Sequence, residues 1–490
     1  MGVEMESTSV PISEPVEKSV ARILITIANL EYEIIRSKEG DYLAFPRTGP
    51  KISKPLNSEQ YNFGGDLMRR YMELTGKIPS ERAINDAIRV LINDSHLYDP
   101  VPVYLRNARL GEFLYIDLGD STGRAVEIKP GSWSIIERPP VYFRRTNLTG
   151  RFPTPIAGGE IHKLFTIVNI PSISENLIIG WLIASMDPSI PRPILGVNGE
   201  QGSGKTFTSK HLSYLVDPSP APLQSPPRDE SAWIEAAANS YCVSLDNLSK
   251  ISNEFSDSLC RAATGIASSK RKLYSDKGVV VYDFKNTIII NGINLAIVRD
   301  DLSDRVLPIY LPIISSKKRN YESDLEKQWN EMYPYIFGGL LDLCAKVLLR
   351  IPHVKLKHLP RMADFARILE AMDEVIGTNS FGDFISEIDK SADISIKRDA
   401  FLTAITEAIT ADWRGTAREL LDVLVSKIPT TTDRSWPSNN REVTEKLTRS
   451  APTLRKLGWT VTNLGSNNHQ NATRWNIAPP ASHASVISTF

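Results

Sequence analysis

The residues with the clearest chemistry form a glycine-rich loop near the middle of the chain. The loop follows the short apolar strand Ile194–Val197 and precedes a helix that begins at about Lys205. In the pattern Gly-x-x-x-x-Gly-Lys-Thr, glycines let backbone N–H groups turn towards a phosphate, and the helix dipole adds positive potential. We expect ATP to be held by Gly199, Glu200, Gln201, Gly202, Ser203, Gly204, Lys205, Thr206 and Phe207.

Two side chains of this loop have expected roles of their own. Lys205 reaches the β- and γ-phosphate oxygens, and Thr206 ligates Mg²⁺. The alternative is a glycine-rich turn that binds no ligand. We prefer the nucleotide because the preceding strand and the following helix both fit the motif.

A second chemical feature ends the buried strand 241–245. Its terminal acid, Asp246, is placed to hold the Mg²⁺ shell, although an Asp capping the next helix is the alternative. The next residue is usually a Glu that orients the attacking water, but here it is Asn247. Because Asn cannot accept a proton, we expect slow hydrolysis or another base, with Glu254 and Asp257 as candidates.

The composition sets limits on what surrounds these motifs. A chain of 490 residues exceeds one ordinary core. Lys+Arg and Asp+Glu number 57 each, so any basic surface for a nucleic acid must be local. Three cysteines without metal-ligand spacing read as buried thiols of a cytoplasmic protein. The longest apolar run, 177–186, is too short to cross a bilayer, so we expect no membrane partner.

The pattern along the chain predicts an α/β protein of several parts. The expected parts are a disordered tail (1–18), an α+β accessory domain (19–153), a phosphate-loop core with a parallel sheet (154–315), a helical extension (316–411), a winged helix-turn-helix (412–478) and a tail (479–490). In the accessory domain we expect a strand within Ala21–Ile35, a helix capped by Ser80, and a hairpin of strands 113–116 and 125–128.

Further motifs follow the acidic strand in a fixed order. They are Arg-Ala-Ala-Thr-Gly at 261–265, Arg-Lys-Leu-Tyr at 271–274, a turn at 275–278, a strand at 279–284, a strand ending in Asn-Gly at 291–292, and Asp-Arg-Val-Leu-Pro-Ile at 304–309. With these motifs the chain resembles the superfamily 3 helicases, a branch of the AAA+ ATPases. It most resembles the helicase part of the poxvirus-type primase-helicases of phages and plasmids. The resemblance covers roughly residues 175–315.

The resemblance implies roles for individual residues. Asn291 would sense the γ-phosphate, and Arg305 would be an arginine finger that reaches the neighbouring subunit's nucleotide, with Arg299 as runner-up. A finger in trans implies a homo-oligomeric ring, such as a hexamer. The hairpin would grip single-stranded DNA in the central channel with Lys277 at its tip and Lys270, Arg271 and Lys272 at its base. A strand-end surface arginine and an ordinary solvated hairpin are the plainer alternatives.

The C-terminal segment has the pattern of a winged helix. Thr416–Glu419 reads as a capping box, followed by expected helices over Asn440–Thr448 and from about Pro452 to Gly458. Two alternating strands, 459–462 and 474–477, complete it. Basic residues outnumber acids here, and we expect Arg449, Arg455 and Lys456 to contact duplex DNA. Winged helices also bind proteins, which is the alternative.

Two acids close together, at 117 and 120, could in principle form a two-metal site. Asp117 and Asp120 enter a hairpin turn, and we expect them to lie in solvent rather than to bind metal. Together the motifs favour an ATP-dependent DNA helicase or translocase that replicates a phage or other mobile element. An ATP-dependent origin binder or loader, and a defence or signalling ATPase, stay open.

Overall fold

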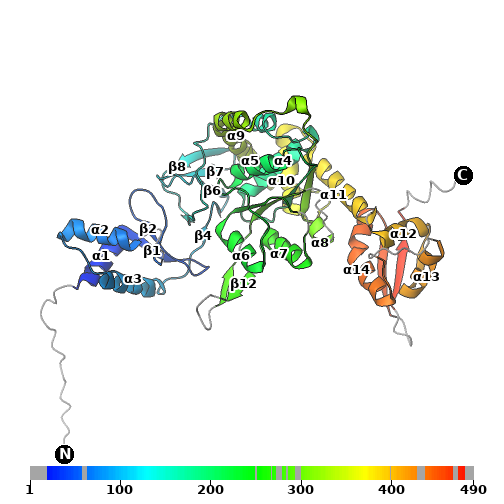
Figure 1. The fold of residues 1–490 in the computed structure, drawn as a ribbon, viewed down its shortest axis with the longest axis horizontal. Helices are drawn as coiled ribbons and strands as arrows, with labels where there is room; N and C mark the ends of the chain where they lie inside the picture. Colours follow the sequence, from blue (N-terminus) through cyan, green and yellow to red (C-terminus); the bar gives the residue numbers. More distant parts are fainter. Residues whose placement is uncertain are drawn as a thin grey trace, which may run out of the picture.

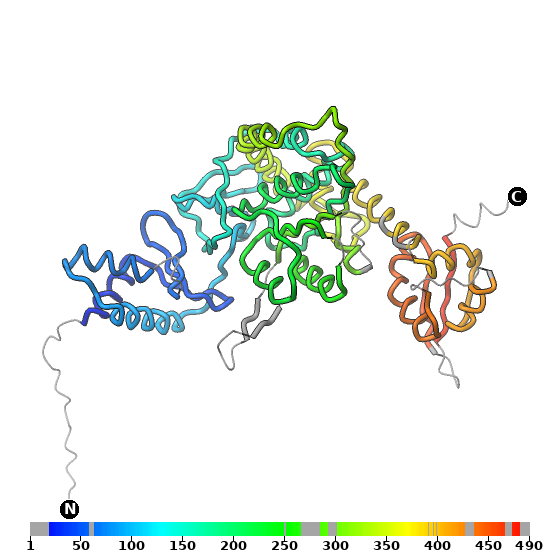
Figure 2. Tube along the Cα trace, in the orientation of Figure 1, coloured from blue at the N-terminus to red at the C-terminus, as the bar shows by residue number. Residues whose placement is uncertain are grey.

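The computed structural model has three parts arranged along one axis (Figure 1). An N-terminal module in blue and a C-terminal module in orange and red lie on opposite sides of a central body. The trace shows that α11 (Ser380–Lys397) leads from the central body into the C-terminal module (Figure 2). The structure describes residues 19–57, 63–248, 251–265, 268–271, 279–282, 285–292, 300–397, 399–427, 436–466 and 473–480.

The N-terminal module packs three helices on a small antiparallel sheet. Its elements are α1 (Val20–Glu31), β1 (Tyr32–Arg36), β2 (Tyr42–Pro46), β3 (Lys54–Pro55), α2 (Phe63–Thr75) and α3 (Glu81–Ser95). Ser80 caps α3 as expected, because its side chain accepts the backbone N–H of Ala83 at 3.2 Å. These elements enclose a core of their own, separate from that of the central body.

The strand expected within Ala21–Ile35 is wrong for most of its length. Residues 20–31 form α1, and only the end of the stretch enters β1. The run is rich in β-branched residues, but Leu24, Ile27 and Ala28 recur at helical spacing and are buried. Ser19 accepts the N–H of Arg22 and begins the helix. Packing against the other helices thus overrides the local strand propensity.

A second antiparallel sheet belongs to the central body. It consists of β5 (Asn107–Leu110), β6 (Phe113–Asp117), β7 (Ala125–Lys129) and β8 (Ser132–Ile136) in sequence order, with β4 (Val103–Tyr104) and β9 (Tyr142–Phe143) paired beside it. The expected hairpin is confirmed, because β6 and β7 pair antiparallel from Leu114–Ile128 to Asp117–Ala125.

The hydrophobic core runs across the boundary expected at residue 154. Leu114, Ile116 and Val126 of this sheet share one buried cluster with the helices of the nucleotide-loop region. Arg106, only 1% exposed, reinforces the junction by donating to the Asp217 carboxylate at 2.7 Å. The sheet is therefore built onto the central body rather than onto the N-terminal module.

The turn after β6 is not solvated, and this corrects the expectation for its two acids. Asp117 and Asp120 are 2% and 4% exposed. Arg145 donates to both oxygens of Asp117 at 2.6 and 2.8 Å, and Arg124 donates to Asp120 at 2.8 Å. Buried carboxylates require such partners, and here they are arginines. The pair serves as a structural ion-pair network.

A four-stranded parallel sheet forms the centre of the molecule. Its order is β11 (Cys242–Leu245), β14 (Thr287–Gly292), β10 (Ile194–Asn198) and β15 (Val306–Tyr310). The accompanying helices are η1 (Ile161–Thr166), α4 (Ser172–Met186), α5 (Lys205–Val216), α6 (Glu230–Asn239), α7 (Asn253–Thr264) and α8 (Asp300–Ser303). Both sheet faces are covered, which explains the continuous burial of β10, β11 and β14.

The helices after the sheet also pack into this core. They are η2 (Ser316–Lys318), α9 (Glu322–Arg350), η3 (Ile351–His353) and α10 (Ala363–Ile376), followed by α11. The stretch Glu322–His353 has the length and apolarity of a membrane span, but 67% of its most apolar window is buried inside the protein. Its position fits a core helix.

A short antiparallel hairpin extends from the sheet beside α6 and α7 (Figure 1). Its strands are β12 (Ser268–Arg271) and β13 (Val279–Tyr282), which pair from Ser268–Tyr282 to Arg271–Val279. A hairpin was expected here, but its first strand begins earlier than residue 271. Lys270 and Arg271 end β12, whereas Lys272, Lys277 and Arg299 lie outside the described residues.

The C-terminal module contains α12 (Ala400–Ala408), β16 (Trp413–Thr416), α13 (Ala417–Lys427), α14 (Asn440–Lys456), β17 (Thr460–Ser466) and β18 (Thr473–Ala478). The strands form an antiparallel sheet in the order β16, β18, β17. The capping box is confirmed: Glu419 accepts the Thr416 N–H at 2.6 Å, and its own N–H donates to the Thr416 hydroxyl at 3.3 Å. The module's core includes α12, so it begins before residue 412.

The two helices expected at 440–448 and 452–458 are one helix. Pro452 lies inside α14, where a proline costs roughly 3 kcal/mol in an isolated helix. Leu447, Ala451 and Leu454 recur on one face and are fully or almost fully buried. Their packing offsets the missing backbone hydrogen bond and carries the helix through the proline.

Candidate nucleotide site

The glycine-rich loop joins β10 to α5 with two glycines in the left-handed region. Gly202 has φ 83° and Gly204 has φ 80°, which other residues adopt only with strain. The Lys205 ammonium folds back over the loop and donates to the carbonyls of Gly199 and Glu200, each at 2.8 Å. Burial is the main cause that lowers the pKa of Lys205, and the nearby Asp246 opposes it. The loop thus has the shape and charge to enclose an anion.

The loop is also held by hydrogen bonds from Asn169, a residue that lies outside the motif. The Asn169 amide donates to the carbonyl of Ser203 at 3.0 Å and to that of Pro312 at 2.6 Å. Ser203 is buried, and its hydroxyl donates to the Glu200 carbonyl at 2.9 Å. A side chain on Gly199 would meet the Ser203 hydroxyl at 2.5 Å. Nothing in the local sequence around Asn169 signals this contact.

Three side chains from different elements meet beside the loop. Thr206, in the first turn of α5, donates to the Asp246 carboxylate at 3.1 Å. Asn291 of β14 donates to the same oxygen at 2.7 Å and to the Ser209 hydroxyl at 3.1 Å. Because β10, β11 and β14 are parallel, their carboxyl ends lie at one edge of the sheet. The fold therefore brings Thr206, Asp246 and Asn291 together, and their roles towards a nucleotide and Mg²⁺ stay predictions.

Asn247 has an unusual backbone. It is the only residue other than glycine with positive φ (56°) among the residues that the structure describes. Its N–H donates to the Asn291 side-chain oxygen at 2.9 Å, while its own side chain is exposed. Asn tolerates the left-handed region better than most residues. The backbone here thus supplies a structural reason for Asn in the place of the usual acid.

The alternative acids lie on α7. Glu254 is exposed in its first turn, and Asp257 is half-buried one turn later. The choice between them as a base stays a prediction.

The outer face of α5 is held by α9. Lys210 donates to Glu326 at 2.7 Å, and the fully buried His211 lies with Nε2 3.6 Å from the same carboxylate. Its Nδ1 is 2.8 Å from the Phe207 carbonyl. Burial lowers the pKa of His211, although Glu326 and the Phe207 carbonyl act in the opposite direction. The helix that carries Lys205 and Thr206 is therefore held to α9 by the Lys210–Glu326 ion pair, beside a buried imidazole.

Arg305 lies at the opposite end of the sheet. It precedes β15, and its carbonyl accepts the N–H of Ile194 at the start of β10 at 2.8 Å, whereas the loop follows the far end of β10. The Arg305 guanidinium is paired with Asp301 at 2.5 Å, and its side chain is 14% exposed. Within one chain it is therefore remote from the loop. A role in trans, as the resemblance implies, stays a prediction.

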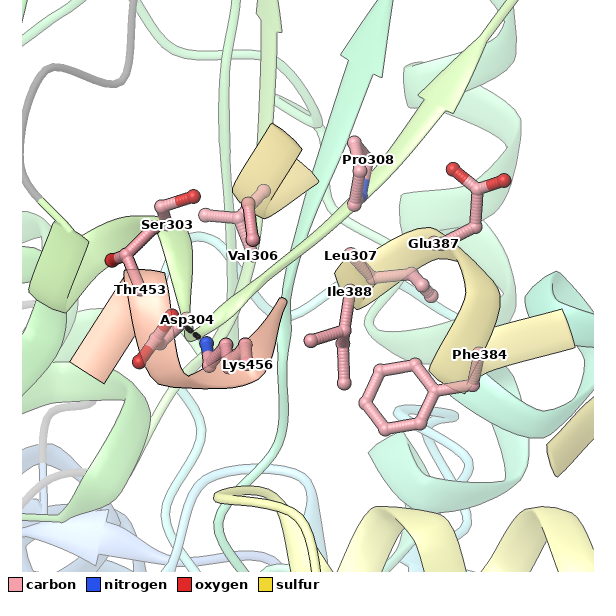
Figure 3. Close-up of a pocket in the computed structure, with 11 residues that line it drawn as sticks. Ser303, Asp304, Val306, Leu307, Pro308, Phe384, Glu387, Ile388, Thr453 and Lys456 are labelled. Carbon is pink, nitrogen blue, oxygen red and sulfur yellow. Dashed lines mark hydrogen bonds and ion pairs between the residues drawn. The ribbon is translucent and has the colours of Figure 1, made fainter. Parts of the chain in front are cut away.

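The ion pairs continue from Arg305 into the C-terminal module. Arg361 binds both Asp301 and Asp304. Lys456 of α14 also binds Asp304, as Figure 3 shows. Beside this pair, Val306, Leu307, Phe384 and Ile388 line a small cavity between β15, α11 and α14. Lys456 was expected to contact DNA, but here its charge joins two parts of the chain.

The other expected DNA contacts differ in their surroundings. Arg455 donates to the Val461 carbonyl at 2.6 and 2.9 Å, which ties α14 to β17. Arg449 lies exposed on α14. Among the residues that the structure describes, Arg449 makes no such contact, and its side chain faces solvent.

Two family models match the chain. Residues 161–394 match the actinomycete integrative conjugative element replication protein, and residues 401–485 match the C-terminal domain of RepA from the same elements. Together the two ranges cover well over half of the sequence. They agree with the expectation of a replication protein from a mobile element, and they indicate integrative conjugative elements rather than phages. A comparison with curated proteins gives no significant match.

Two solved structures that match the chain show only loose similarity. The A-form apo structure of the NrS-1 C-terminal region has 14% sequence identity and a TM-score of 0.42, covering 94% of this chain and 99% of that chain. A JCV helicase bound to a small molecule has 12% identity and a TM-score of 0.26, covering 47% of this chain and 64% of that chain. Values this low carry no inference about activity.

Proposed function

We propose that this replication protein of an integrative conjugative element is an ATP-driven DNA translocase or helicase of the superfamily 3 type. The observation that carries the proposal is the meeting of Thr206, Asp246 and Asn291 beside the glycine-rich loop. The hydrogen bonds among them, from 2.7 to 3.1 Å, come from three separate elements. The family matches support a role in replication.

The residues present fit a nucleoside triphosphate with Mg²⁺. The loop has its positive-φ glycines and a lysine folded over it, and a hydroxyl and a carboxylate stand side by side as hard oxygen ligands. Thr206 and Asp246 would hold the ion, and the loop would hold the phosphates. The ion would supply positive charge that neutralises the phosphate oxygens.

The chain's own residues have distinct tasks in this proposal. Lys205 gives up its two carbonyl contacts and places its ammonium on the phosphate oxygens. Asn291 keeps the Asp246 carboxylate oriented and fixes the backbone at Asn247. Asn247 orients water but takes no proton. The proton must therefore pass to another group, for which Glu254 and Asp257 are the candidates.

The DNA-facing parts are the β12–β13 hairpin and the C-terminal module. The element order of the C-terminal module supports a winged helix that reads duplex DNA through α14. That order is α12, β16, α13, α14, β17, β18, and the strands lie in the sheet as β16, β18, β17. Lysines and arginines on a hairpin suit a motor that contacts the backbone rather than bases. In a homo-oligomeric ring, Arg305 would leave Asp301 to act on a neighbour's nucleotide.

A second function has specific support in Asn247. An ATP-dependent origin binder or loader needs nucleotide binding but not fast turnover, and the missing acid suits it. A defence or signalling ATPase is the third class; there the C-terminal module would bind protein.

The deciding experiment measures ATP hydrolysis and strand separation with the purified full chain. We expect single-stranded DNA to stimulate hydrolysis and forked DNA to be unwound, with both lost in Lys205→Ala. ATPase activity without DNA stimulation, unwinding or rings in negative-stain images would overturn the helicase proposal. Slow turnover with tight, ATP-dependent duplex binding would establish the loader instead.

A further inference from the structure

The segment after β15 lies along the glycine-rich loop in the same chain. The N–H of Leu311 donates to the Asn198 carbonyl at 2.8 Å, and that of Ile314 donates to the Gly202 carbonyl at 3.3 Å. A Cβ on Gly204 would lie 3.3 Å from the Ile314 side chain. Through Asn169, Pro312 is also tied to the Ser203 carbonyl. Two backbone hydrogen bonds and the Asn169 bridge thus hold residues 311–314 against the loop.

This segment brings a cation to the loop. One terminal nitrogen of Arg319 lies 3.1 Å from the position that a Cβ on Gly202 would take. The Arg319 side chain is exposed, and its guanidinium has no ion-pair partner among the residues that the structure describes. Arg305 and Arg361 of the same body, in contrast, are paired with carboxylates. An unpaired arginine at the rim of an anion-binding loop has its natural partner in that anion.

We propose that Arg319 is a phosphate-binding residue of the nucleotide site, supplied by the same chain as the loop. The inference rests on the proposed nucleotide site and deepens it. Backbone N–H groups of the loop and the Lys205 ammonium would grip the phosphates from the helix side, and the Arg319 fork would approach across Gly202. The left-handed backbone and missing side chain of Gly202 leave the room for that approach.

With Arg319 beside the loop, one subunit supplies by itself the groups that bind the phosphates. A guanidinium bound to phosphate oxygens makes charge-assisted, often paired hydrogen bonds. One chain would then hold triphosphate tightly before any neighbour contributes. Nucleotide binding and the assembly of subunits then become separate steps, and Arg319 contributes to nucleotide binding.

The test is equilibrium binding of fluorescent ATP and ADP analogues (mant-ATP and mant-ADP) to the full chain. Loss of one charge-assisted interaction predicts ~10- to 100-fold weaker binding for Arg319→Ala. Arg319→Lys should recover part of the affinity, because it keeps the charge but not the fork. Lys318→Ala is the matched control, since it removes the same charge one residue away; we expect little change.

Two further readouts separate this inference from the proposed function. If Lys205→Ala abolishes binding while Arg319→Ala binds as tightly as Lys318→Ala, the Arg319 inference is overturned and the nucleotide site stands. If Lys205→Ala also leaves binding intact, both fail. The affinity of Arg319→Ala should lose part of its dependence on salt concentration, which a merely structural role would not change. Arg319→Gln, also measured with its thermal stability, keeps the test valid if the alanine variant misfolds.

Discussion

The Asn291 amide donates to the Asp246 carboxylate at 2.7 Å. The same side chain accepts the N–H of Asn247 through its oxygen at 2.9 Å, and it is 1% exposed. One buried amide thus sets both the acid beside the loop and the backbone that follows it. Its amide and oxygen therefore couple the position of the Asp246 carboxylate to the backbone at Asn247.

Replacing this residue tests that coupling. Asn291→Ala removes one of the two side-chain donors to Asp246 and leaves the Asn247 N–H without its partner, which should cost about 1–3 kcal/mol of stability. Hydrolysis should fall by ~10²-fold, with nucleotide binding largely kept. Asn286→Ala is the control, because that buried amide donates to Ala237 and Ser240 carbonyls at 2.9 and 2.7 Å, away from the site. Equal loss of activity in both variants would contradict the assignment.

The left-handed backbone at Asn247 predicts which residues it tolerates. Asn247→Gly should keep the thermal stability, since glycine adopts positive φ without strain. Asn247→Val should lose about 1–2 kcal/mol, because a β-branched side chain is strained there. Asn247→Glu should also be destabilised and should not speed hydrolysis. Faster hydrolysis by a stable Asn247→Glu variant would show that the missing acid, not the backbone, limits the site.

The buried His211 predicts a loss of stability in mild acid. Burial lowers its pKa below the ordinary value of 6.5, so the unfolded chain binds the proton more readily. Stability is therefore full above about pH 6.5 and falls below it, by at most ~1.4 kcal/mol per pH unit for one proton. Glu326, which faces the ring, has a lowered pKa of its own; that contribution is lost only at more acidic pH.

Thermal unfolding between pH 5 and 8 measures this effect. His211→Phe should flatten the curve, while His162→Gln, at an exposed position, should leave it unchanged. An unaltered slope in His211→Phe would assign the acid sensitivity to other groups.

A shared site between subunits predicts complementation. Arg305→Ala and Lys205→Ala should each abolish hydrolysis, and a mixture should regain activity above the sum of the two. In mixed assemblies some interfaces combine an intact Lys205 with an intact Arg305. Arg361→Ala, which also contacts Asp301, controls for the loss of the ion pairs. An active Arg305→Ala variant would remove this residue as the finger.

Variants of Lys456 and Arg449 should distinguish the docking of the C-terminal module on the central body from DNA binding. Lys456→Ala breaks the pair with Asp304, so we expect faster proteolysis between α11 and α12 with duplex binding little changed. Arg449→Ala should weaken duplex binding, measured by fluorescence anisotropy, without affecting proteolysis. Weaker DNA binding by Lys456→Ala with unchanged proteolysis would instead identify Lys456 as a DNA contact.

Local sequence determined the parts whose conformation depends on neighbours along the chain. Turns and caps are set by a few adjacent residues, so they could be predicted from the sequence. The examples are the glycine-rich loop between strand and helix, the caps at Ser80 and Thr416, and the β6–β7 hairpin. The acid at the end of the buried strand, Asp246, was predicted from the strand pattern, whereas Asn291 was assigned only through the family resemblance.

Tertiary structure alone decided which partners the charged and apolar side chains found. It turned a β-branched run into α1, carried α14 through Pro452, and buried Asp117 and Asp120 against arginines. It also paired Lys456 with Asp304 and brought Arg319 to Gly202, more than a hundred residues away in sequence. Such contacts join segments that no local pattern relates, because burial and ion pairing depend on what folds against a residue rather than on what precedes it.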